Sequence, residues 1–175
     1  TLGAEDVLLT DNSTLRLDTE SSLTSGSAAI RMTGGTFEFS GTPAFAAVHP
    51  DNATVLQLNA AASISRDAPL SIGGLNLNGH ALTLETETTD LSINSTLVLN
   101  QSGSQLITKS ADLVLPYLLQ LNAGALTSTG GTLTLAQGGT LGNSATLDVR
   151  GTTLELADTL AAEAGTFQTN GASGL

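Results

Sequence analysis

Short segments in which apolar and polar residues alternate recur along the whole chain, with a period near 21 residues. Each segment has the form apolar–x–apolar and is bounded by Gly, Ser, Thr, Asn or Pro. Such alternation buries one side of the segment and exposes the other, which is typical of a half-buried β-strand. A fixed repeat of this length is typical of solenoids, and the segments fall into three columns of predicted strands.

The first column contains pairs of apolar residues separated by steps of 22, 19, 19, 22 and 22 residues. Its members are Leu15/Leu17, Phe37/Phe39, Leu56/Leu58, Leu75/Leu77, Leu97/Leu99 and Leu119/Leu121. Leu141 continues this column as an imperfect member, with Gly142 expected where the second apolar residue should be.

The other two columns are less even. The third column has steps of 21, 22, 20 and 21 after residue 70, and its members are Ile30/Met32, Leu70/Ile72, Leu91/Ile93, Leu113/Leu115, Leu133/Leu135 and Leu154/Leu156. The second column has variable steps, and its members are Leu23, Phe45, Ile64, Leu82/Leu84, Leu106, Leu126, Leu147/Val149 and Phe167. No third-column member is expected near His49 and Pro50, so residues 44–54 are predicted to form an irregular coil.

These columns predict an all-β, single-stranded parallel β-helix with three short strands per coil and about eight coils. With a spacing of about 4.8 Å between hydrogen-bonded strands, eight coils would form a rod of roughly 38 Å. We expect residues 1–175 to form one solenoid domain that belongs to a longer chain, because the sequence begins at Thr1 without Met.

An asparagine directly follows the first-column strand in four consecutive coils, at Asn59, Asn78, Asn100 and Asn122. Asparagine tolerates the left-handed conformation of a sharp corner, and stacked amides can hydrogen-bond from one coil to the next. The spacing therefore predicts an asparagine ladder along one corner of the solenoid.

Composition narrows the possible chemistry. The formal net charge is −11, which argues against nucleic-acid partners and against binding to anionic membranes. The chain has no cysteine, and no apolar run reaches the roughly 20 residues that a membrane-spanning helix needs. Neither nucleic acid nor membrane insertion is expected.

The segments Gly130-Gly-Thr-Leu-Thr-Leu-Ala136 and Gly139-Thr-Leu-Gly-Asn-Ser-Ala-Thr-Leu-Asp-Val149 resemble passenger repeats of bacterial autotransporters and filamentous-haemagglutinin-like adhesins. The resemblance covers roughly residues 50–160. It implies secretion to the bacterial cell surface, a right-handed β-helical stem, and a role in adhesion or in display of another domain.

Candidate chemical sites are few. Asp67, Asp90 and Asp112 are separated by 23 and 22 residues, so they could form a vertical acidic row that binds Ca²⁺ weakly. His49 with Asp51 could form a metal or acid–base site in the irregular coil, and His80 is expected in an exposed turn. No Gly-x-Ser-x-Gly, Walker or His-Glu-x-x-His motif is present.

Three functions are compatible with this sequence. The first is a non-catalytic extracellular stalk or adhesive surface without a cofactor, joined to neighbouring coils, to copies of itself end to end, or to a host or carbohydrate surface. The second is a polysaccharide-binding or polysaccharide-cleaving β-helix, for which Arg31, Arg66 and Lys109 would be the basic residues. The third is an ice-binding solenoid, which needs an outward row of threonines such as Thr83 and Thr134.

Overall fold

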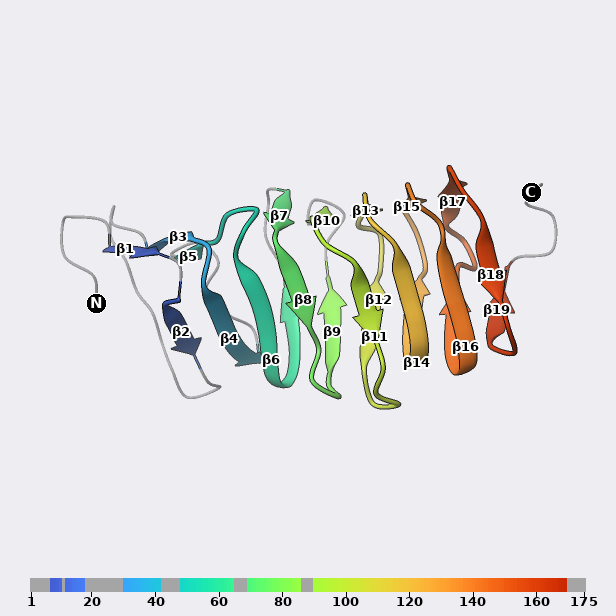
Figure 1. The fold of residues 1–175 in the computed structure, drawn as a ribbon, viewed down its shortest axis with the longest axis horizontal. Coiled ribbons are helices and arrows are strands. Elements are labelled where there is room, and N and C mark those ends of the chain that lie inside the picture. The colour runs from blue at the N-terminus through green and yellow to red at the C-terminus, as the bar shows by residue number, and fades with distance from the viewer. Residues whose placement is uncertain are drawn as a thin grey trace.

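The structure of the chain is a computed structural model. The structure describes residues 7–10, 12–17, 30–41, 48–64, 69–85 and 90–169. All regular elements of these residues are β-strands, and every strand pairing is parallel. The strands follow one another along an elongated body, from β1 and β2 at one end to β17, β18 and β19 at the other (Figure 1).

The first column confirms the predicted register. Its strands are β2 (Thr14–Leu17), β4 (Thr36–Gly41), β6 (Val55–Ile64), β8 (Gly74–Asn76), β11 (Leu97–Leu99), β14 (Leu119–Ser128), β16 (Gly139–Asp148) and β18 (Leu160–Ala162). Leu15 pairs with Phe37, Phe37 with Leu56, and Leu56 with Leu75.

The second column uses the later halves of β6, β14 and β16 together with separate strands. These separate strands are β9 (Ala81–Leu84), β12 (Gln105–Thr108) and β19 (Thr166–Gln168). The described strands stack as a β-solenoid of about six turns, fewer than the eight coils that the sequence predicted. The predicted members Leu23 and Phe45 lie outside the described residues.

The third column consists of two groups of strands. The first group is β1 (Val7–Thr10), β3 (Ile30–Thr33) and β5 (Val48–His49); the second is β7 (Leu70–Ile72), β10 (Leu91–Ile93), β13 (Leu113–Leu115), β15 (Thr132–Leu135) and β17 (Thr153–Leu156). Leu70, Leu91, Leu113, Leu133 and Leu154 are aligned in the second group, as the spacing predicted.

Two details of the predicted register were wrong. The third column does have a member near His49, because Val48 pairs with Ile30 and is fully buried. In the first column, Gly139 lies opposite Leu119 and Leu141 lies opposite Leu121. Leu141 is therefore the second inward residue of its strand, and Gly139 takes the place of the first.

The interior is a stack of apolar, mostly aliphatic side chains that point inward from the three columns, with Phe37 and Phe39 near the N-terminal end. Leu56, Leu82, Leu106, Leu126 and Leu147 are all completely buried. Among the described residues, no buried side-chain nitrogen or oxygen lacks a hydrogen-bond partner. Burial of this repeating apolar surface is the main force that holds the coils together.

The second column also buries hydroxyl groups that the apolar pattern did not predict. Thr108 and Ser128 are fully buried, and the Thr108 Oγ1 donates to Ser128 Oγ at 2.7 Å. Ser128 Oγ in turn lies 3.2 Å from the Gly130 carbonyl. The hydroxyls satisfy one another and the backbone, so the polar pair is tolerated inside the solenoid.

Candidate functional site

The four asparagines after the first column do not share one hydrogen-bonding role. Asn59 Nδ2 donates to Glu38 Oε2 at 3.3 Å, and Asn78 Nδ2 donates to the Leu58 carbonyl at 3.4 Å. Neither of these two side-chain amides donates to another described asparagine. Of the four, only Asn78 has a positive φ, of 49°, whereas Asn100 and Asn122 are exposed.

A polar row does run along the first column, but two residues before the predicted asparagines. It consists of the outward residues Arg16, Glu38, Gln57 and Asn76. Arg16 Nε lies 3.8 Å from Glu38 Oε2, Gln57 Nε2 donates to Glu38 Oε1 at 3.4 Å, and Asn76 Nδ2 donates to Gln57 Oε1 at 3.2 Å. Each of these residues is the middle residue of an apolar–x–apolar segment of the first column, and this position in the sequence could have revealed the row.

Asp90 and Asp112 stack at the corner before the third column, as their spacing predicted. Asp90 Oδ1 accepts the Asp112 N–H at 3.1 Å, and Asp112 Oδ1 accepts the Thr132 N–H at 2.6 Å. Asp67 lies outside the described residues. Within the described part of the chain, no group of three or more acidic, His or Cys side chains could hold a metal ion. The visible role of Asp90 and Asp112 is to link successive coils.

The residues considered as an acid–base or metal site are also engaged in structure. Asp51 Oδ1 accepts the N–H groups of Gly34 and Ala53, both at 3.0 Å, and lies 2.9 Å from Thr54 Oγ1. His49 is exposed on β5, and His80 donates its backbone N–H to the Leu77 carbonyl in a turn. Asp51 therefore binds its own turn to the preceding coil.

Two carboxylates have a pKa below the usual range for aspartate. Burial raises the pKa of Asp51, but the hydrogen bonds from Gly34, Ala53 and Thr54 outweigh it, so the net shift is downward. Asp148 has a lowered pKa chiefly because Arg150 donates two side-chain hydrogen bonds to it, at 2.9 and 2.6 Å. Both groups favour the ionised state in the folded protein.

These shifts predict that the protein is less stable in acid. A carboxylate with a lowered pKa contributes its full stabilisation above the unfolded-state pKa of about 3.9, and loses it as the pH falls toward the folded-state pKa. Urea unfolding between pH 3 and pH 7 should show this decline. The double variant Asp51→Asn/Asp148→Asn should have a shallower decline than the wild type, whereas the exposed Glu163→Gln control should not differ. An unchanged slope in the double variant would contradict the assignment.

Two of the described basic residues are paired with carboxylates that do not belong to the predicted acidic row. Lys109 forms an ion pair with Glu85, and Arg150 forms one with Asp148. Arg31 lies on the outward side of β3, and Arg66 is outside the described residues. In the described part of the chain, we find no arrangement that combines clustered carboxylates with a basic residue.

Residues other than threonine interrupt the outward row that contains Thr83 in the second column and the one that contains Thr134 in the third. Thr83 pairs with Ile107 in the next coil. Thr134 pairs with Val114 on one side, and its hydroxyl donates to Glu155 Oε2 at 3.0 Å on the other. A flat, regular hydroxyl array is thus missing along these two columns of the described residues.

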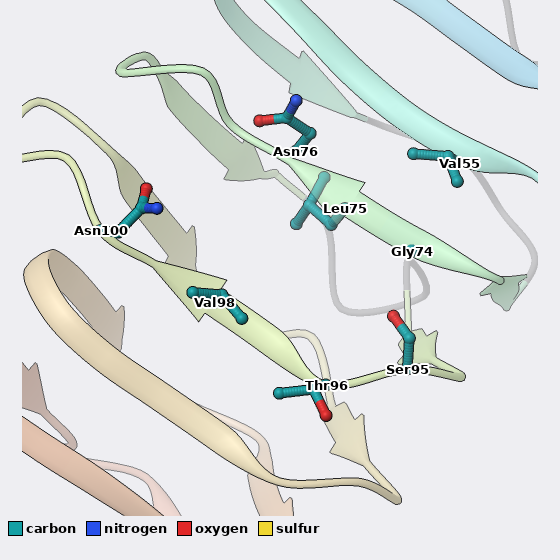
Figure 2. Close-up of a pocket in the computed structure, with 8 residues that line it drawn as sticks. All are labelled: Val55, Gly74, Leu75, Asn76, Ser95, Thr96, Val98 and Asn100. Atoms are coloured by element: carbon teal, nitrogen blue, oxygen red, sulfur yellow. The ribbon is translucent and has the colours of Figure 1, made fainter.

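A groove of about 340 Å³ opens on the first column, between β8 and β11. Its lining residues come from β6, β8, β11 and the residues that flank β11, and are Val55, Gly74, Leu75, Asn76, Ser95, Thr96, Val98 and Asn100. Figure 2 shows Val55 on one side of β8, and Ser95, Thr96, Val98 and Asn100 along the other. None of these residues is charged at neutral pH.

The groove coincides with an interruption in strand pairing. β8 pairs with β6, and β11 pairs with β14, but between residues 69–85 and 90–169 no pairing joins β8 to β11. Leu75, which aligns with the completely buried Leu56, is consequently only half-buried. The absence of a side chain at Gly74 also leaves space in the groove. A Cβ at this position would lie 3.4 Å from Ser95 Oγ and 3.6 Å from Val55 Cγ2.

The described residues include no helix that is long and apolar enough to cross a membrane. Comparison of the chain with protein-family models, with curated proteins and with solved structures gives no match.

Proposed function

We propose that this chain is a non-catalytic extracellular β-solenoid that serves as a structural stalk or adhesive surface. The observation that carries the proposal is the use made of its polar side chains. Asp51, Asp90, Asp112 and Asn94 each form a hydrogen bond with the backbone of a neighbouring coil. These four polar side chains are thus occupied in joining successive coils of a regular rod.

The extracellular and adhesive parts of the proposal are supported by the resemblance of residues 130–149 to bacterial surface-protein repeats. Antibodies against the chain should label intact cells of its source, and external protease should remove the signal. Recovery of the protein only from the cytosolic fraction would contradict an extracellular role. Release of reducing ends or unsaturated products from a polysaccharide panel would contradict the non-catalytic role.

The last coil suggests how the rod is continued. Among the described strands, β17 pairs only with β15, and β18 and β19 pair only with β16. Leu154, Leu156 and Leu160 are half-buried there, unlike the inward leucines of the central coils. An open edge with apolar inward residues is a template for further strands. We propose that coils of a longer chain, or a second copy, stack on this edge.

Light scattering over a range of protein concentrations tests whether copies of the chain stack on this edge. We expect the average mass of the isolated chain to rise with concentration, because each copy would offer unpaired backbone groups. A constant monomer mass at the highest concentrations would show that this edge does not associate with copies of itself.

A further inference from the structure

We propose that the groove between β8 and β11 is a binding site for a neutral polysaccharide chain. The inference rests on the proposed adhesive function and specifies the ligand class and the residues that would contact it.

The opening is local because both of its ends are held together. Before it, the backbone N–H and Nδ2 of Asn94 donate to the Ile72 carbonyl at 2.8 and 3.0 Å. After it, the Gly79 N–H donates to Ser104 Oγ at 3.2 Å and the Gln105 N–H donates to the His80 carbonyl at 3.1 Å. The strands on either side of the gap are also paired, β7 with β10 before it and β9 with β12 after it.

This restraint excludes an inserted peptide strand. An additional strand would need a separation of about 9.6 Å between β8 and β11, twice the usual spacing of about 4.8 Å. Coils that are hydrogen-bonded at both ends of such a short gap cannot separate that far. The groove instead suits groups that reach into it from a chain lying across the surface.

The groove contains hydrogen-bonding groups that have no partner among the described residues. In a parallel sheet each strand directs alternate backbone N–H and C=O groups toward each neighbour, so the missing pairing leaves such groups on the facing edges of β8 and β11. The side chains of Ser95, Thr96 and Asn100 form no hydrogen bond with another described residue. Sugar hydroxyls both donate and accept, so they match a mixed set of amide, hydroxyl and backbone groups.

The apolar and electrostatic properties of the groove point the same way. Val55 and Val98 are more than a third exposed, and with Leu75 they provide an apolar surface for the C–H groups of sugar rings. The lining residues are uncharged, whereas the chain carries a net charge of −11. An acidic polysaccharide would be repelled by this field, so the ligand class is neutral.

Affinity electrophoresis in native gels tests the proposal, because the acidic chain migrates readily at neutral pH. The gels would contain galactomannan, β-1,3-glucan or dextran as neutral probes, polygalacturonate as the acidic probe, or gelatin as the polypeptide probe. We expect retardation by at least one neutral probe and by neither of the other two. Retardation by polygalacturonate or gelatin alone, or by no probe, would overturn the proposal.

Three variants locate the binding. Asn100→Ala should weaken retardation about three- to tenfold, the effect of losing one or two modest hydrogen bonds. Gly74→Ala, which narrows the groove, should weaken it at least as much, and Asn122→Ala is the control because Asn122 is exposed at the same corner outside the groove. Equal retardation of all three would overturn the assignment to the groove.

Failure of the polysaccharide-binding test can be distinguished from failure of the proposed extracellular function. Antibody labelling of intact cells does not depend on the groove, so labelling without polysaccharide binding would overturn only the ligand site. Polysaccharide binding by a protein confined to the cytosol would overturn only the extracellular role. Circular-dichroism melts of each variant, which should match that of the wild type, show that the fold is retained.

Discussion

Replacement of Leu121 by aspartate should abolish the cooperative unfolding transition of the protein at room temperature. Leu121 is completely buried and is paired with Leu99 on one side and Leu141 on the other. Truncation of a buried leucine costs about 2–5 kcal/mol, and burial of a carboxylate without a partner costs several kcal/mol more. The sum is comparable with the stability of a typical domain, about 5–15 kcal/mol.

The matched control is Gln120→Asp in the same strand. Gln120 points outward and pairs with Val98 and Thr140, so its replacement places no like charge directly opposite. Far-ultraviolet circular dichroism against temperature should show a wild-type-like melt for Gln120→Asp and a lost or strongly lowered transition for Leu121→Asp. Similar melts for the two variants would mean that the inward and outward positions of this strand are assigned incorrectly.

Replacement of Gly124 by alanine should destabilise the solenoid by about 2–4 kcal/mol. Gly124 has a φ of 78°, a conformation that costs an L-residue about 1–2 kcal/mol. A Cβ there would also lie 2.3 Å from the Ser104 carbonyl oxygen and 2.8 Å from that of Gln101. Both atoms belong to the backbone of the preceding coil, so the clash can be relieved only by moving that coil.

Gly74→Ala is the control for this prediction, because its Cβ would make ordinary contacts of 3.4 Å or more and its φ is not positive. Thermal melts should place Gly124→Ala at least about 5 °C below the wild type, since each kcal/mol lowers the melting temperature by about 2–4 °C in a chain of this size. Gly74→Ala should melt within about 2 °C of the wild type. Equal melting temperatures for the two variants would show that the corner at Gly124 tolerates a side chain.

The sequence was less informative wherever one apolar residue stood alone. Val48 lies between Ala47 and His49, so no alternation marked it, yet pairing with Ile30 buries it completely. Gly139 was not recognised as an inward residue because it has no side chain to contribute to the pattern. Its buried position follows from contact with Leu119, since a Cβ at Gly139 would lie 2.7 Å from the Leu119 carbonyl oxygen.

The candidate site was predicted even less fully. The spacing of Asn59, Asn78, Asn100 and Asn122 indicated equivalent positions in successive coils, but hydrogen-bond partners depend on the side chains of the neighbouring coil. Asn59 lies within reach of Glu38, whereas Asn100 has no described partner and lines the groove. The asparagine of the same sequence motif, Leu-x-Leu-Asn, therefore has different hydrogen-bonding roles in different coils.

The sequence by itself determined the repeat, the parallel β-solenoid and the inward face of nearly every strand, because side chains alternate across a strand whatever its neighbours are. Only the tertiary structure decided which strands pair. The open gap between β8 and β11 is invisible in the sequence, where Leu75-Asn-Leu77 and Leu97-Val-Leu99 match the other coils. Pairing depends on the separation of two backbones, and the contacts at the ends of these strands set that separation.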